Sequence, residues 1–128
     1  MKNKKTVNIK TDTEGFFRRW LTLTQPFHKL ASREQEVLAV LLYYHYLFKK
    51  TTRDENVIWK MVFDYSTKAK LKEKLDMKDG TLQTTLSKLR KKNVIVKNRI
   101  ISTLIPNLSD NAVNFQITYN LIRVDGKQ

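Results

Sequence analysis

Apolar residues recur at helical spacing along most of the chain, and the pattern changes to a period of two near its end. The most apolar segment, residues 32–50, places hydrophobic side chains around most of a helical circumference, which predicts the central helix of a core. Ser32 and Gln35 match a capping box at its start. Residues 55–65 repeat the helical spacing and predict a second core helix, with an apolar stripe of Val57, Ile58, Met61, Val62 and Tyr65.

A third helix is predicted to begin near Ser66 or Thr67, either of which can cap its first turn. Its apolar positions are Ala69, Leu71 and Leu75. A tight turn follows at residues 76–78, and Asp79 can cap the next helix. This segment therefore predicts a short helix that leads through a turn into another.

A fourth helix is predicted over residues 80–91. Leu82, Leu86 and Leu89 follow the i, i+4, i+7 spacing of one buried face. Asn93 follows at the point where the helix ends, and asparagine tolerates the left-handed conformation that ends many helices. Because the leucines face inward, the polar side chains between them are expected to point outward together.

The end of the chain predicts a β-hairpin. Apolar and polar residues alternate over residues 113–121, as in a strand with one buried face. Residues 94–105 are predicted to pair with it, with Pro106–Ala112 as the loop. The expected fold is therefore mainly α with a C-terminal β-hairpin, a single domain over residues 16–124 after a flexible basic arm over residues 1–15.

The order of apolar residues in this part of the chain resembles the winged helix-turn-helix family. It is most similar to MarR-like and phage or plasmid replication-type regulators, over roughly residues 57–121. The residues that carry the resemblance are Leu71, Leu75, Met77, Thr81, Leu82, Leu86, Leu89, Asn93, Val94 and Ile95. Asn93 stands where the family usually has Gly, and Lys78 and Asp79 stand where it usually has Ser or Thr. The resemblance implies a helix-turn-helix over residues 66–92 and a wing hairpin over residues 94–121.

Positive charge is concentrated in the same segment. The chain of 128 residues has a formal net charge of +13, and residues 66–99 contribute +8 of it. Residues 1–19 contribute a further +4. A charge excess centred on one supersecondary unit is typical of nucleic-acid binding, whereas lysine on an exposed face is otherwise simply solvated. The basic arm is either a solvated terminus or a segment that follows phosphates or enters a minor groove.

Several classes of function have no residues to support them. The chain has no Cys, its two His are not spaced to bind a metal, and its three Gly are not spaced to bind a phosphate. Neither a metal nor another cofactor is therefore expected. His45 lies on an apolar helical face and is expected to be a hydrogen-bonded core residue. The acidic pairs lie at predicted helix ends, where the helix dipole explains them. We therefore expect that the protein is not an enzyme and has no membrane span. It is expected in the cytoplasm, which is that of the host cell if a phage encodes the protein.

The helix over residues 80–91 is expected to lie in the major groove of double-stranded DNA. Its candidate base contacts are Gln83, Thr84, Ser87 and Lys88, since Gln can pair with adenine and Thr can contact a thymine methyl. The candidate phosphate contacts are Lys68, Lys70, Lys72, Lys74, Arg90, Lys91, Lys92, Lys97 and Arg99. The expected role is a small transcription regulator or replication accessory of phage or mobile-element type. A homodimer would restore affinity through paired half-sites.

Two alternatives remain open. One is a winged-helix module that docks another protein as a component of a viral or replication complex, through an aromatic surface of Phe16, Phe17, Trp20, Tyr43 and Trp59. The other is binding of structured RNA, which the charge suits but which no stacking motif supports. The loop over residues 106–112 contains Asp110 and no Lys or Arg. This argues against a wing loop that grips a minor groove.

Overall fold

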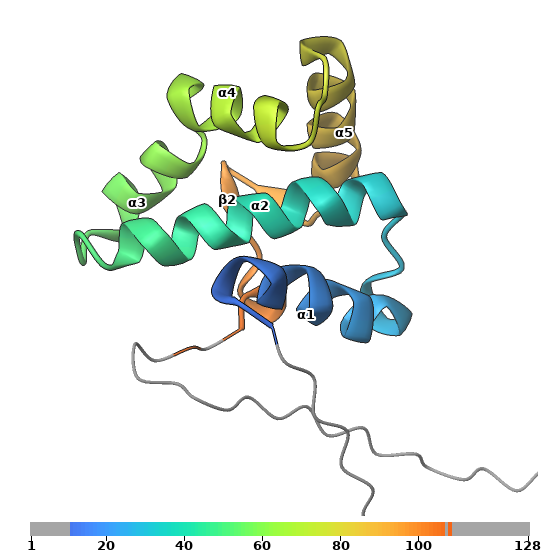
Figure 1. The fold of residues 1–128 in the computed structure, drawn as a ribbon, viewed down its shortest axis with the longest axis horizontal. Coiled ribbons are helices and arrows are strands. Elements are labelled where there is room, and N and C mark those ends of the chain that lie inside the picture. Colours follow the sequence, from blue (N-terminus) through green and yellow to red (C-terminus); the bar gives the residue numbers. More distant parts are fainter. Residues whose placement is uncertain (1–10, 107, 109–128) are drawn as a thin grey trace, which may run out of the picture.

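A computed structural model describes residues 11–106 and 108, and these residues form a mainly helical domain with a small antiparallel hairpin at its C-terminal end. The helices are α1 (Thr13–His28), α2 (Ser32–Lys49), α3 (Glu55–Val62), α4 (Tyr65–Lys74) and α5 (Asp79–Lys91). The strands β1 (Ile95–Val96) and β2 (Arg99–Ile100) precede a 3₁₀ turn, η1 (Ser102–Leu104). The arrangement has a winged-helix-like layout (Figure 1).

Helix α2 is the centre of the domain, as its apolar circumference predicts. It lies between α1 and α4, with α3 near its C-terminal end and α5 near its N-terminal end (Figure 1). Its side chains from Val37 to Leu42 are all buried. The predicted leucines of α5, Leu82, Leu86 and Leu89, are also buried, each at most 1% exposed. These side chains belong to one hydrophobic core.

Helix α1 contains Phe16, Phe17 and Trp20 and begins at Thr13, inside the segment expected to be an arm. Asp12 caps it by accepting a hydrogen bond from the Gly15 N–H at 2.6 Å. Pro26 lies in the last turn of α1. Proline has no N–H to donate to the carbonyl four residues earlier, and the helix ends two residues later at His28. The Trp20 indole N–H donates to the Leu104 carbonyl at 2.9 Å and ties α1 to η1.

The start of α2 differs from the predicted capping box by one residue. The N-cap is Ala31, and its backbone N–H donates to a Glu34 carboxylate oxygen at 3.0 Å. Gln35 instead donates from Nε2 to the Leu30 carbonyl at 2.8 Å. Alanine offers no side-chain acceptor, so the carboxylate at the third helical position supplies the capping interaction alone.

The predicted helix over residues 55–65 is two helices. Helix α3 ends at Val62, and Asp64 caps α4 by accepting hydrogen bonds from the Tyr65 N–H at 2.8 Å and the Ser66 hydroxyl at 3.1 Å. Neither Ser66 nor Thr67 is therefore the cap. The helical period restarts at this break, which leaves Tyr65 79% exposed.

The break also changes the buried face of α3. Val57, expected in the apolar stripe, is 40% exposed, whereas Trp59, which lies off that stripe, is buried. Ile58 and Val62 are buried as predicted. The short helix therefore packs a different face from the one that the longer pattern indicates.

Helix α5 starts at Asp79, and its N-cap is Lys78, which makes no capping hydrogen bond through its side chain. Asp79 is therefore not the cap; it lies in the first turn. At the other end, Asn93 adopts the predicted left-handed conformation with a φ of 60°. The Val94 N–H donates to the Leu89 carbonyl at 3.0 Å, which closes the helix and turns the chain toward β1.

The described hairpin lies entirely within the segment predicted to form one strand of the wing. Ile95 pairs with Ile100 and Val96 pairs with Arg99, so residues 94–105 contain both strands and η1 instead of one strand. The turn residues Lys97 and Asn98 have φ values of 53° and 56°, the left-handed pair that a type I′ turn requires. The predicted strand over residues 113–121 lies outside the described residues, as do residue 107 and residues 109–112 of the predicted loop.

Candidate nucleic-acid interface

The outer side of α5 carries the residues predicted to contact bases. Gln83, Thr84 and Lys88 are exposed, and Ser87 is half-buried. Burial of the leucine face produces this arrangement, because side chains between the leucines must point away from the core. Thr85 is the exception among the polar residues: it is buried, and its hydroxyl donates to the Thr81 carbonyl at 2.8 Å. A polar helix face is therefore open on the molecular surface.

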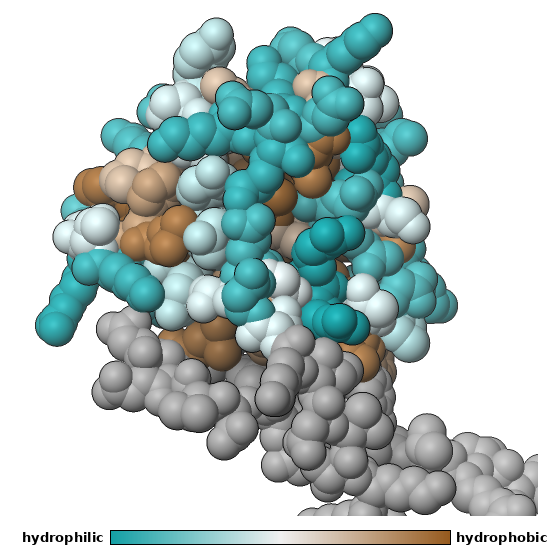
Figure 2. All heavy atoms as spheres, in the orientation of Figure 1, coloured by the Kyte–Doolittle hydropathy of each residue, from teal (hydrophilic) through white to brown (hydrophobic). Residues whose placement is uncertain are grey.

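The four predicted base contacts do not form one cluster. Thr84 and Lys88 line a groove between α5 and the start of α2, whereas Gln83 and Ser87 do not. Figure 2 shows mostly hydrophilic side chains over α4 and α5 on the face in view. The polar surface of α5 thus has a part that faces α2 and a part that faces away from it.

Three of the nine predicted phosphate contacts form ion pairs within the described chain. Lys72 Nζ lies 3.1 Å from Asp79 Oδ1, and Lys92 Nζ lies 2.7 Å from Glu34 Oε1. Lys74 pairs with Glu14 and lies 5.3 Å from the centre of the Tyr43 ring. The hydrogen bond to Glu14 raises the pKa of the Lys74 ammonium, against a smaller opposite effect of burial. These lysines already have structural partners.

The other six predicted phosphate contacts are more available. Arg99 donates a hydrogen bond to the Asn56 side-chain oxygen and so links β2 to the start of α3. No ion pair within residues 11–106 holds the remaining five, which are Lys68, Lys70, Arg90, Lys91 and Lys97. All of these except the half-buried Lys68 are exposed. They lie on α4, in the last turn of α5 and at the tip of the hairpin.

Lys97 lies at the tip of the hairpin. The sequence points to a wing loop without a cation, but the described hairpin turns at Lys97 and Asn98, and Arg99 follows in β2. The tip of the short wing is therefore cationic. The sequence contains a signal for it, an Asn-containing pair that follows Val94–Val96 and precedes Arg99 and Ile100.

A carboxylate is buried at the junction of α2 and α5. Glu34 is 4% exposed and receives hydrogen bonds from Lys92 and from the Ala31 N–H. Burial by itself would raise the pKa of the Glu34 carboxyl, but these donors outweigh it and hold the pKa below its ordinary value. The Glu34–Lys92 pair thus joins the N-terminal turn of α2 to the C-terminal end of α5.

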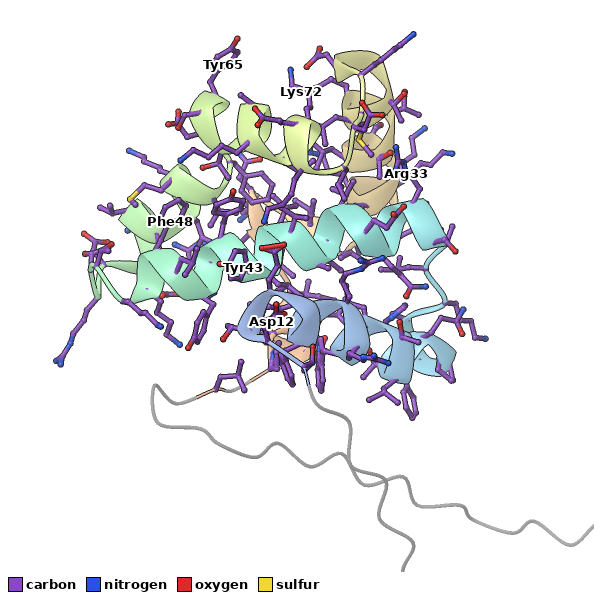
Figure 3. The ribbon with its side chains drawn as sticks, in the orientation of Figure 1. Asp12, Arg33, Tyr43, Phe48, Tyr65 and Lys72 are labelled. Atoms are coloured by element: carbon purple, nitrogen blue, oxygen red, sulfur yellow. The ribbon has the colours of Figure 1, made fainter. Side chains whose placement is uncertain are left out.

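Two cations near α5 were not among the predicted contacts. Arg33 and Lys78 line the same groove as Thr84 and Lys88. Figure 3 shows Arg33 beside the end of α5 that is lower in the view. The groove has a volume of about 610 Å³. Sequence spacing cannot find this set, because residue 33 and residues 78–88 come together only through packing of α2 against α5.

The aromatic residues proposed as a partner surface do not form one. Phe17 and Trp59 are 2% and 5% exposed, so they belong to the core and are not available to another protein. Phe16, Trp20 and Tyr43 are half-buried and pack against that core. Within the set, the Phe17 and Tyr43 ring centres lie 6.4 Å apart, whereas Trp59 stacks on His45 with ring centres 4.3 Å apart.

His45 is buried as expected but lacks one expected hydrogen bond. Its Nε2 has no hydrogen-bond partner, and the Glu55 carboxylate is 4.0 Å away. Burial lowers the pKa of His45, with Glu55 acting in the opposite direction.

Within residues 11–106 and 108, no group of three or more His, Cys, Asp or Glu side chains could hold a metal ion. No helix in that part of the chain is long and apolar enough to cross a membrane.

Comparison with protein-family models, with curated proteins and with solved structures found no match. The class of this protein is therefore defined by its fold, a mainly helical domain with a winged-helix-like hairpin.

Proposed function

We propose that this protein is a winged helix-turn-helix DNA-binding protein that inserts α5 into the major groove of double-stranded DNA. The observation that carries the proposal is the exposed polar face of α5, together with cations on α4, α5 and the hairpin that have no ion pair in the described chain. A helix of about 10–12 Å diameter fits a major groove about 12 Å wide. The protein would act in the cytoplasm as a small transcription regulator or replication accessory, of the kind that phages and mobile elements encode.

Each part of the surface has a separate role in this proposal. Gln83 reads a base, with the geometry to pair with adenine through two hydrogen bonds, and Thr84 contacts a thymine methyl. Arg90, Lys91 and Lys97 contact phosphates, which position the helix but carry no sequence information. Docking through the aromatic set is less well supported, because two of its members are buried.

The first test is the salt dependence of duplex binding. Binding sites are selected from a random duplex library, and affinity is then measured by fluorescence anisotropy at several salt concentrations. If the five cations without ion pairs engage phosphates, log affinity falls with log salt at a slope of about −4 or steeper. A slope shallower than about −2, or tighter binding to structured RNA than to duplex, contradicts the proposal.

The second test separates base reading from phosphate binding. Gln83→Ala should relax preference at one base pair by about 1–3 kcal/mol, whereas Lys91→Ala should weaken all duplexes alike and reduce the slope by about 0.9. The matched control is Lys60→Ala, which removes an exposed lysine from α3, near the opposite end of α2 from α5 (Figure 1). Equal effects of Gln83→Ala and Lys91→Ala on every duplex would refute base reading by Gln83.

A further inference from the structure

The groove between α2 and α5 has a positively charged lining. Arg33 reaches it from α2, Lys88 from α5 and Lys78 from the turn before α5. Glu34 also lines the groove, but its carboxylate is neutralised by Lys92 at 2.7 Å. The three other charged residues of the lining therefore give the groove an excess of positive charge.

These cations are available to a ligand. Neither Lys78 nor Lys88 forms an ion pair with another described residue. Arg33 lies 3.2 Å from Glu36, but its side chain is 42% exposed and the pair is a surface contact at i, i+3 spacing. Such pairs contribute little, so the guanidinium can turn toward an anion at small cost.

Gly80, in the first turn of α5, has no packing reason to be glycine. A Cβ built there meets nothing within 4 Å, and its φ is not in the left-handed region. Glycine lowers helix stability relative to alanine, but it lets a ligand approach the backbone closely. Gly80 lines the groove together with Thr81 and Thr84, which are exposed and carry hydroxyls. The groove therefore offers hydrogen-bond donors as well as charge.

The groove is continuous with the proposed DNA-binding face, because Thr84 and Lys88 belong to both. A helix that fills a major groove lies close to the sugar-phosphate backbones on both sides. The side of α5 that faces α2 would then meet the phosphates of one bordering strand. The ligand chemistry that suits this lining is a phosphate group.

We propose that this groove binds a backbone phosphate of the DNA strand that borders the major groove, through Arg33, Lys78 and Lys88, with close approach at Gly80. The proposal rests on the proposed DNA-binding function and extends the contact surface to the start of α2. It also assigns Lys88 to a phosphate instead of a base. Arg33, which lies outside the helix-turn-helix, becomes a positioning residue for α5.

The charge test uses the full chain and the duplex selected by the wild-type protein. Arg33→Gln and Lys78→Gln should each reduce the salt slope by about 0.9 and weaken all duplexes by the same factor. Their matched controls are Arg53→Gln, in the loop between α2 and α3, and Lys60→Gln on α3, both exposed and distant from α5 (Figure 1). Both controls should keep the wild-type slope.

The backbone test uses Gly80→Ala. The thermal midpoint should stay unchanged or rise, because the added methyl group meets open space and alanine favours helix. Duplex affinity should nevertheless fall by about tenfold, as expected for loss of one hydrogen bond to a charged group. A variant that is more stable and binds as tightly as wild type would overturn close approach at this position.

The outcomes separate the two proposals. If wild-type protein does not bind duplex DNA, both fail. If it binds and Gln83→Ala relaxes base preference, but Arg33→Gln and Lys78→Gln match their controls, only the groove assignment fails. A titration with inorganic phosphate, followed by the Gly80 amide resonance, distinguishes the source of the phosphate. Saturable binding of inorganic phosphate, together with unchanged duplex affinity of the groove variants, would overturn the assignment to DNA.

Discussion

Removal of the Glu34 carboxylate should destabilise the fold well beyond the effect of an ordinary surface residue. Glu34 is 4% exposed and accepts hydrogen bonds from the Ala31 N–H at 3.0 Å and from Lys92 Nζ at 2.7 Å. Glu34→Ala removes both contacts. It therefore weakens the start of α2 and its attachment to α5 together.

The magnitude follows from the two contacts. Loss of a capping acceptor costs about 1 kcal/mol. A hydrogen bond between charged groups contributes about 1.5–3 kcal/mol, and the lower end applies here because the Lys92 side chain is 45% exposed and screened by water. The free energy of unfolding should fall by about 2–3 kcal/mol in total. With a urea m-value of about 1.5 kcal/mol/M, the unfolding midpoint should fall by about 1.3–2 M.

The assay is urea unfolding followed by circular dichroism, with Glu36→Ala as the matched control. Glu36 is on the same helix and pairs with Arg33 at i, i+3 spacing on the surface, so its loss should cost at most about 0.5 kcal/mol. Glu34→Gln keeps an acceptor for the Ala31 N–H but removes the charge, and it should fall between the two. A Glu34→Ala midpoint no lower than that of Glu36→Ala would refute the reasoning.

The pH dependence gives the same contact a second test. The pKa of folded Glu34 lies below its ordinary value of 4.5, so the folded state releases the proton more readily than the unfolded state. The contribution of the charge to stability is therefore complete above about pH 4.5 and is lost as pH falls through the folded pKa. The difference in the free energy of unfolding between wild type and Glu34→Gln should therefore shrink as pH falls below about 4.5. A difference that stays constant down to about pH 3 contradicts the assigned cause.

Two further predictions concern the core. Burial lowers the pKa of His45; Lys49 lowers it further, and Glu55 acts in the opposite direction. The unfolded state therefore takes up the proton first, and the free energy of unfolding of the wild type should decrease as pH falls below the ordinary pKa of 6.5. His45→Phe should remove this part of the slope in urea midpoints measured between pH 7.5 and 5.5, and equal slopes would contradict it. Leu86→Ala should lower the free energy of unfolding by about 2–5 kcal/mol, because Leu86 is 1% exposed, and a loss below about 1 kcal/mol would show that the site is poorly packed.

Local periodicity predicted much of the helical structure correctly. The leucine stripe of α5 is buried, α2 is central and Asn93 ends α5 in the left-handed conformation. These features depend on side chains three or four residues apart, so they can be read directly from the sequence. The exposed positions of Gln83 and Thr84 follow from the same periodicity.

Errors arose where two local signals competed. The apolar spacing of residues 55–65 suggested one helix, but the cap at Asp64 interrupts it. The apolar residues of the segment 94–105 favoured a single strand, whereas the chain turns already at Lys97 and Asn98. In both places a short polar signal ended an element that the longer apolar pattern would have continued.

The sequence alone determined that this chain forms a mainly helical domain with a polar, cationic face on one amphipathic helix. It did not determine which cations on that face are available. Lys92 pairs with Glu34 and Lys74 with Glu14, partners 58 and 60 residues away along the chain. Arg33 likewise joins Lys78 and Lys88 around one groove only because α2 packs against α5. Helical periodicity acts within a few residues, whereas ion pairs and grooves depend on distances in space, and only the tertiary structure sets those distances.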